Sequence, residues 1–148
     1  MNILQAPHVQ DARAIVRVQL KSKSVWSDKD KRAAGIVCSS YDVAAILIFD
    51  FKEKIIPLEP ILKNWGPSIV DCRNILDPYI RGMRENSGPE YWDGFDELYK
   101  AATKWAIERL IKARGLLASG SVEAAKISAE IAALQEKLVI AGLSATEA

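Results

Sequence analysis

Two arginines and two aromatic residues form the cluster in this sequence with the clearest potential for ligand chemistry. Arg81 and Arg84 follow a proline in a helical pattern, and Tyr91 and Trp92 come shortly afterwards. Aromatic rings can stack on a planar ligand, and guanidinium groups can bind its negative charges through paired hydrogen bonds. One interpretation is therefore a ligand sensor or enzyme that binds an anionic or nucleotide-like molecule at this cluster.

A packing role for the same arginines competes with ligand binding. Together with Arg73 they share one helical segment, which must pack against the segment that follows it. Arg84 would then pair with Asp96 or Glu97, because a partly buried guanidinium group needs a charged partner. We favour this packing role, in which the cluster joins two helices and binds no ligand.

Residues suited to catalysis or metal binding are scarce. The single histidine, His8, lies beside Pro7, and nucleophilic catalysis needs a base held next to its nucleophile. Asp93, Asp96 and Glu97 have a spacing that can offer carboxylates to Mg²⁺, but their place early in a helix explains them better. The sequence contains no glycine-rich phosphate loop. We therefore predict no catalytic residue, no metal site and no cofactor, and we favour a non-enzymatic protein.

Basic residues gather near the start of the sequence. Arg13, Arg17 and Lys21 recur every four residues along a predicted helix, and residues 1–34 carry seven Lys and Arg against three Asp. Such a row can attract phosphate groups, acidic lipids or an acidic protein. No DNA-binding motif accompanies this basic patch, so nucleic acid is a less favoured partner than protein. The simplest interpretation of the row is a solvated helix face.

The last predicted helix, over residues 122–141, carries an apolar seam with alternating steps of three and four residues. This seam either folds back on the long helix before it, as a hairpin, or packs against a second molecule. Apolar residues of that preceding helix, from Trp105 to Ile111, spread around more of its surface than one helix would cover. We therefore predict a homo-oligomer built with the last two helices. The predicted interface residues are Ile127, Ile131, Leu134 and Leu138.

The composition fits a single globular domain. The chain has 148 residues, of which 49% are hydrophobic and 26% charged. Its net charge of +1 is not that of a general nucleic-acid coat or a polybasic membrane binder. Two cysteines and one histidine exclude a disulfide scaffold and a zinc module rich in Cys and His. Cys38 and Cys72 lie in helical patterns, where we expect buried, reduced thiols.

Helical periodicity alternates with proline, glycine and serine residues along the chain. Ser27 and Asp30 have the spacing of a capping box, and Trp26 before them could act as a hydrophobic staple. No stretch shows the alternation of a strand. The expected helices cover residues 9–24, 27–50, 58–84, 87–117 and 122–141.

Prolines and glycines mark the predicted helix boundaries in the middle of the chain. Trp65-Gly66-Pro67 must bend or break the third helix, because proline lacks an amide donor and clashes with the preceding turn. Pro78 should kink the same helix again. Ser87, with Pro89 and Glu90 after it, has the residues of a helix start, so we expect the long helix to begin there.

These elements predict an all-α fold, an irregular bundle of five to six helices that ends in a long helical hairpin. Residues 1–118 would form the helical bundle, and residues 119–148 a C-terminal helix that packs on the bundle or on a second subunit. Residues 52–54 form a polar connection. No run of 18 apolar, uncharged residues and no signal-peptide pattern occurs, so we expect no transmembrane segment and a cytoplasmic location.

Aromatic and proline motifs over residues 9–102 resemble those of a group of small bacterial helical proteins catalogued as a domain of unknown function. The motifs are Trp26, Trp65-Gly66-Pro67, Pro78-Tyr79-Ile80, Gly88-Pro89-x-Tyr91-Trp92 and Phe95-x-Glu97-Leu98. The resemblance implies a helical fold and supplies no catalytic residues. Many members of that group carry an N-terminal membrane helix, which we do not expect in this sequence.

The function predicted from these observations is that of a non-enzymatic helical interaction module that self-associates and binds a macromolecular partner. The first alternative is the ligand sensor or enzyme that uses the cluster of arginines and aromatic residues. The second alternative is a nucleic-acid accessory protein that uses the basic N-terminal helix.

Overall fold

The computed structural model describes residues 3–50 and 56–143, and the regular structure within them is entirely helical. The all-α fold predicted from the sequence is therefore confirmed. The α-helices are α1 (Pro7–Ala14), α2 (Asp28–Ala45), α3 (Leu58–Ser87), α4 (Asp93–Gly115) and α5 (Val122–Ile140). Short π-helical turns extend α1 and α2, at Ile15–Gln19 and Ile46–Asp50, and a 3₁₀ turn covers Leu20–Ser22. The predicted connection at residues 52–54 lies outside the described residues, as do residues 144–148.

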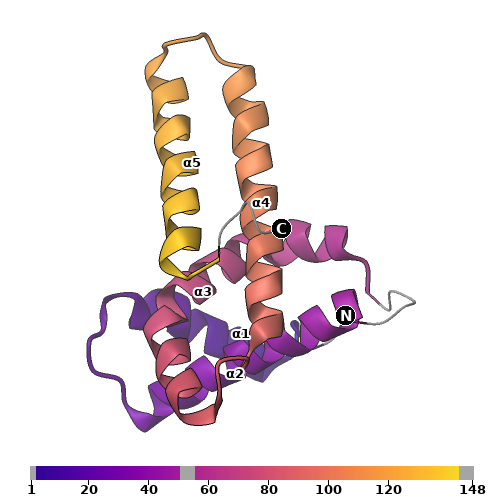
Figure 1. Cartoon of the computed structure of the whole chain (residues 1–148), viewed down its shortest axis with the longest axis vertical. Helices are drawn as coiled ribbons and strands as arrows, with labels where there is room; N and C mark the ends of the chain where they lie inside the picture. Colours follow the sequence, from indigo (N-terminus) through magenta and orange to yellow (C-terminus); the bar gives the residue numbers. More distant parts are fainter. Residues whose placement is uncertain (1–2, 51–55, 144–148) are drawn as a thin grey trace.

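Helix α2 is the central helix of the bundle, and α1, α3 and α4 pack against it (Figure 1). Its apolar residues cover a wide face, which is why so much of this helix is buried. The buried residues of α2 include Val37, Cys38, Tyr41 and Ala44. The burial predicted for both cysteines is confirmed, since Cys72 of α3 is buried in the same core.

The start of α2 confirms the predicted capping box. The Ser27 hydroxyl oxygen accepts a hydrogen bond from the Asp30 N–H at 3.1 Å, and the Asp30 carboxylate accepts one from the Ser27 N–H at 3.0 Å. The predicted staple by Trp26 is wrong, because a polar residue, Lys31, occupies the position one turn into the helix that a staple needs. The indole ring lies instead against the ring of Tyr79, at a centroid distance of 5.7 Å.

The segment Asp28–Asp50 also has the length and composition of a membrane-spanning helix, with 23 residues and a window of mean hydropathy 1.5. Half of that window is buried inside the bundle. In this structure the segment is the central core helix, and a core helix of this kind meets the same criteria. The absence of a transmembrane segment stays a prediction.

Helix α3 runs without a break through Pro67 and Pro78 over 30 residues. A break at Pro67 was one of the two outcomes predicted, and it does not occur; the ribbon instead changes direction along its length (Figure 1). An interior proline costs about 3 kcal/mol, whereas burial of each large apolar side chain contributes roughly 1.5–3 kcal/mol. Ile61 and Leu62 are buried before Pro67, and Ile69 after it. Packing on both sides of the proline therefore outweighs its local cost.

The predicted start of the long helix at Ser87 is wrong, because α4 begins six residues later, at Asp93. Gly88 ends α3 with a φ of 111°, and its N–H donates to the Arg84 carbonyl oxygen at 3.0 Å. Trp92 has a left-handed backbone with a φ of 63°, which a continuing helix cannot include. Residues 88–92 are therefore a connection between two helices.

Helices α4 and α5 form the predicted hairpin, which projects away from α1, α2 and α3 (Figure 1). The Ser121 hydroxyl oxygen caps α5 by accepting a hydrogen bond from the Ala124 N–H at 3.1 Å. Gly142 follows the helix with a φ of 76°, and the Leu143 N–H donates to the Leu138 carbonyl oxygen at 2.7 Å. Gly142 therefore supplies the left-handed position that ends the helix, as glycine commonly does after a helix C-terminus.

Candidate functional site

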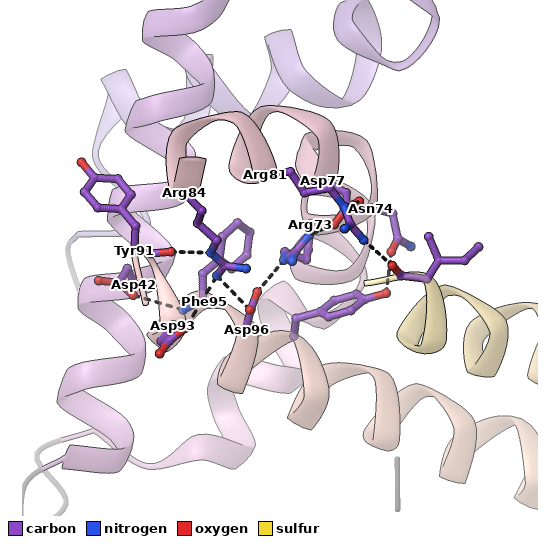
Figure 2. Close-up of polar contacts among 12 residues, drawn as sticks. Asp42, Arg73, Asn74, Asp77, Arg81, Arg84, Tyr91, Asp93, Phe95 and Asp96 are labelled. Carbon is purple, nitrogen blue, oxygen red and sulfur yellow. Dashed lines mark hydrogen bonds and ion pairs between the residues drawn. The ribbon is translucent and has the colours of Figure 1, made fainter. Parts of the chain in front are cut away.

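Arg73 of α3 is a fully buried arginine at the centre of a polar network between α3 and α4 (Figure 2). Its guanidinium group donates to Asp96 Oδ1 at 2.7 Å and to Asp77 Oδ1 at 2.8 Å. Burial lowers the pKa of Arg73, but the charge of Asp96 and the bonds to both aspartates outweigh that effect and raise it. Arg73 is therefore a charged and paired residue of the core.

Arg84 holds the connection between α3 and α4 in place. Its Nε–H donates to the Tyr91 carbonyl oxygen at 2.8 Å, and its Nη2–H donates to Asp96 Oδ2 at 2.8 Å. The predicted pairing of Arg84 with Asp96 is confirmed. Asp93 lies farther from this guanidinium group, at 3.8 Å, and is mostly exposed.

Arg81 ties α3 to the end of α5. Its guanidinium group donates to Asp77 Oδ2 at 2.7 Å and to the carbonyl oxygen of Ile140. Burial raises the pKa of Asp77, but hydrogen bonds from Arg81 and Arg73 outweigh that effect and hold it below its ordinary value. All three arginines of the cluster are thus directed at groups of the same chain (Figure 2).

The aromatic residues of the predicted ligand cluster lie against each other. The ring of Trp92 is 4.6 Å from that of Tyr91 and 5.9 Å from that of Tyr79, measured between centroids. Tyr79 in turn contacts Trp26. Arg84 binds the main-chain carbonyl oxygen of Tyr91, while the rings of Tyr91 and Trp92 pack on each other and on Tyr79.

The start of α4 is capped by a residue of α2. Asp42 Oδ1 accepts a hydrogen bond from the Phe95 N–H at 3.2 Å, a role that local sequence cannot reveal. A Cβ atom on Gly94 would lie 2.6 Å from the same carboxylate oxygen, so glycine permits this close approach. Burial raises the pKa of Asp42.

Among the described residues, Arg17 is the member of the predicted basic patch that forms an ion pair, while a buried nitrogen of the Arg13 guanidinium group has no hydrogen-bond partner. Arg17 donates to Asp71 of α3 at 2.9 Å, Arg13 is half-buried and Lys21 is exposed. Arg13 and Arg17 line the same shallow hollow, together with Asp71, and the row between them passes through the π-helical turn Ile15–Gln19. The carboxylate of Asp71 also reduces the positive charge that this surface presents.

The predicted interface residues of α5 face the inside of the hairpin. Ile131 and Leu138 are 7% and 2% exposed, and Ile127 and Leu134 are half-buried. Leu138 belongs to the main core, and Leu134 packs against it. The seam therefore folds back on its own chain, which was the alternative to an oligomer contact. In this structure these four side chains are not an open docking surface.

Sequence reasoning missed the tip of the hairpin, which we define as residues 116–122. Leu116 is 89% exposed and Val122 is 68% exposed, while Ile111 one turn below is 46% exposed. Leu117 is also exposed, at 37%, so several apolar side chains gather at this end of the hairpin, and a gathered apolar patch points to a contact surface where a single exposed leucine would not. The apolar pair Leu116-Leu117, at the end of the helix expected over residues 87–117, was the signal in the sequence that could have indicated this surface.

A groove lies where the hairpin joins the bundle, with a volume of about 760 Å³. We call it the base groove. Its walls come from the π-helical turn after α2, the start of α3, and the hairpin, so it exists only in the folded chain. The apolar side chains that line it are Phe49, Leu58, Leu62, Trp105, Ile107 and Leu138.

The described residues contain no group of three or more His, Cys, Asp or Glu side chains placed to hold a metal ion. The two thiols are buried among apolar residues. Burial raises the pKa of the Cys38 thiol and raises that of Cys72 to about 11. These thiols therefore lack the lowered pKa of a nucleophilic cysteine.

Comparisons of this chain with protein-family models, curated proteins and solved structures found no match. The resemblance to the bacterial helical group stays an expectation from the motifs alone. Two features of this fold bear on its function: the paired arginine network, and the hairpin with its apolar tip.

Proposed function

We propose that this protein is a non-enzymatic helical interaction module whose α4–α5 hairpin is the docking element. It self-associates through this hairpin and binds a macromolecular partner. The observation that carries the proposal is the apolar tip, where Leu116 is 89% and Val122 is 68% exposed at the end of a projecting hairpin (Figure 1). Burying such side chains against a partner contributes roughly 1.5–3 kcal/mol each.

The arginine network supports an interaction module over a ligand sensor. A site for an anionic ligand needs guanidinium groups that are free to donate to it. Arg84 donates to Asp96 and a backbone carbonyl, and Arg81 donates to Asp77 and Ile140. These bonds hold the hairpin on the bundle, which a docking element requires.

The test compares two double variants of the full chain. The hairpin variant carries Leu116→Glu and Val122→Glu, and the matched control carries Val18→Glu and Val25→Glu at residues that are 76% and 82% exposed. Light scattering after size exclusion should find an oligomer for the wild type and the control. The hairpin variant should dissociate, with a dissociation constant at least about a hundredfold higher, because two buried side chains at roughly 1.5–3 kcal/mol each are lost.

Circular dichroism should find the same helix content in all three proteins, because all four substituted residues are exposed. An oligomer that persists in the hairpin variant would contradict the proposal, and so would a wild-type chain that is monomeric.

A further inference from the structure

We propose that the hollow beside Arg13 and Arg17 binds the carboxylate group of a small organic acid with one negative charge. This inference goes beyond the proposed function, because the residues that line the hollow come from α1, the π-helical turn after it and α3, and not from the hairpin. The hollow has a volume of about 500 Å³. Small-molecule sites occupy roughly 300–1,000 Å³, so it has room for such a ligand.

Arg13 is a cation without a partner in the part of the chain that the structure describes. Its side chain is half-buried and forms no ion pair there, and its Nη1 atom is buried with no hydrogen-bond partner. A buried guanidinium nitrogen without a partner costs free energy, because it has given up its hydrogen bonds to water. The same side chain lines the hollow, so an anion bound there would supply the negative charge that Arg13 lacks.

The positive charge at the hollow acts on groups in the core behind it. Burial raises the pKa of the Tyr41 hydroxyl and of the Cys72 thiol, and the charges of Arg13 and Arg17 oppose that rise. Salt screens a partly buried charge less than one that is surrounded by water. The hollow should therefore attract an anion more strongly than an ordinary surface arginine does.

The charges that line the hollow favour a ligand with a single negative charge. Arg17 donates through Nε and Nη2 to Asp71 Oδ2, at 3.3 and 2.9 Å. Two guanidinium groups and one carboxylate leave the hollow with a net charge of +1. One carboxylate on the ligand balances that charge, whereas the second charge of a phosphate monoester would be repelled by Asp71. The fork of a guanidinium group also matches the two oxygens of a carboxylate.

Apolar side chains complete the lining of the hollow. Ala14 and Val18 both belong to it, and Val18 is 76% exposed. Methylene groups next to the carboxylate of the ligand would contact these two side chains and leave water, which favours binding. We therefore expect an acid with a short apolar chain, such as butyrate, to bind more tightly than acetate.

The test is an NMR titration of the full chain at pH 7 with sodium butyrate, compared with sodium chloride at the same ionic strength. Butyrate should cause saturable shifts of backbone amide signals, largest at residues 13–18. It should bind about five times more tightly than acetate, because its two additional methylene groups are partly buried. The inference would be overturned if butyrate gave no saturable shift, if chloride gave the same shifts, or if the two acids bound equally.

Two variants separate the site from the general positive charge of the protein. Arg13→Met keeps an unbranched side chain and removes the charge, so it should weaken butyrate binding at least about tenfold, through the loss of charge-assisted hydrogen bonds. Arg32→Met is the matched control, because it removes an exposed arginine of α2 that does not line the hollow. Equal affinities of the two variants for butyrate would overturn the inference.

Asp71→Asn tests the choice of ligand charge through a gain of binding, which a misfolded variant could not produce. The Asp71 side chain is 51% exposed, so its substitution leaves the core intact. The change raises the net charge of the hollow to +2, and inorganic phosphate should bind this variant at least about tenfold more tightly than it binds the wild type. Phosphate that bound the wild type as tightly as butyrate does would overturn the assignment of a carboxylate ligand.

Discussion

Arg73 is the residue on which the contact between α3 and α4 most directly depends. Its guanidinium group is 1% exposed and is shared between Asp77 and Asp96. A buried charge is tolerated only with its partners in place, so the loss of one partner costs more than the pair contributes. Asp96 is the critical partner, because it also accepts a hydrogen bond from Arg84.

Substitution of Asp96 should therefore destabilise the fold severely. We expect Asp96→Ala to lower the free energy of unfolding by about 3–5 kcal/mol, because it leaves the buried Arg73 charge without its closest carboxylate. Asp93→Ala is the matched control: this aspartate is 65% exposed and lies 3.8 Å from Arg84, and its loss should cost less than about 1 kcal/mol. Urea unfolding at neutral pH measures both values. Equal losses for the two variants would contradict the role assigned to Asp96.

The lowered pKa of Asp77 predicts a loss of stability in acid. Its folded-state pKa lies below the ordinary value of 3.8, so the unfolded chain takes up this proton at a higher pH than the folded chain does. The stability from Asp77 is therefore complete above pH 3.8 and is lost as the pH falls through the folded-state value. Urea unfolding at a series of pH values should show a shallower acid decline for Asp77→Asn. Identical slopes for variant and wild type would disprove the assignment.

At the scale of elements, the local sequence predicts where a helix begins when the residue that caps it is a near neighbour in the chain. The capping box of Ser27 and Asp30 and the Ser121 cap need only neighbouring residues, and both helices begin as predicted. The start of α4 could not be predicted, because its cap is Asp42, which lies 53 residues before the Phe95 amide that it binds. The continuity of α3 through Pro67 likewise depends on packing partners from other helices.

Gly66 shows how a residue that predicts a break can serve packing instead. A Cβ atom at this position would lie 2.7 Å from the ring of Trp105 in α4, so the helix and the hairpin meet here at close range. The sequence indicated that the backbone at Gly66 is unusual, but it did not reveal the packing of Trp105 against this turn. The same holds for the arginine cluster: its members were predicted to lie together, but the bond from Arg81 to Ile140 joins residues 59 positions apart.

Two glycine substitutions in α3 should have opposite effects. Gly66→Ala should lower the free energy of unfolding by about 1–3 kcal/mol, because the added methyl group overlaps Trp105. Gly82→Ala meets no atom within 4 Å, so it should raise the free energy of unfolding by about 0.5–1 kcal/mol through its helix propensity. Thermal unfolding measures both. A stabilising Gly66→Ala would show that Trp105 does not pack against this turn.

At the scale of the whole molecule, the hairpin and the bundle differ in how much of each is buried. Helix α2 has buried residues along its whole length, whereas α5 buries only Ala124, Ile131 and Leu138. The contacts of α5 with the bundle are concentrated at its C-terminal end, where Leu138 joins the core and Arg81 binds the Ile140 carbonyl oxygen. Elements with few buried contacts open at lower free energy than the core does.

Hydrogen exchange should therefore separate α5 from α2. We expect the amides of α5 to exchange faster than those of α2, and Arg81→Gln to speed exchange further in the last turn of α5, with α2 unchanged. Mass spectrometry of peptides from the two helices measures both rates. If α5 exchanged as slowly as α2, the hairpin and the bundle would open as one unit.

Helix α4 runs unbroken from Asp93 in the bundle to Gly115 beside the tip. Its first turns are fixed by the pairs of Asp96 with Arg73 and Arg84, while its far end stands clear of the bundle (Figure 1). The helix is thus held by the ion pairs at Asp96 and is free at Gly115, roughly 28 Å farther along its axis. A rotation of α4 by about 6° around Asp96 would move Gly115 by roughly 3 Å. A slight repacking of one carboxylate between two guanidinium groups would thereby become a displacement as wide as an atom at the far end of the helix.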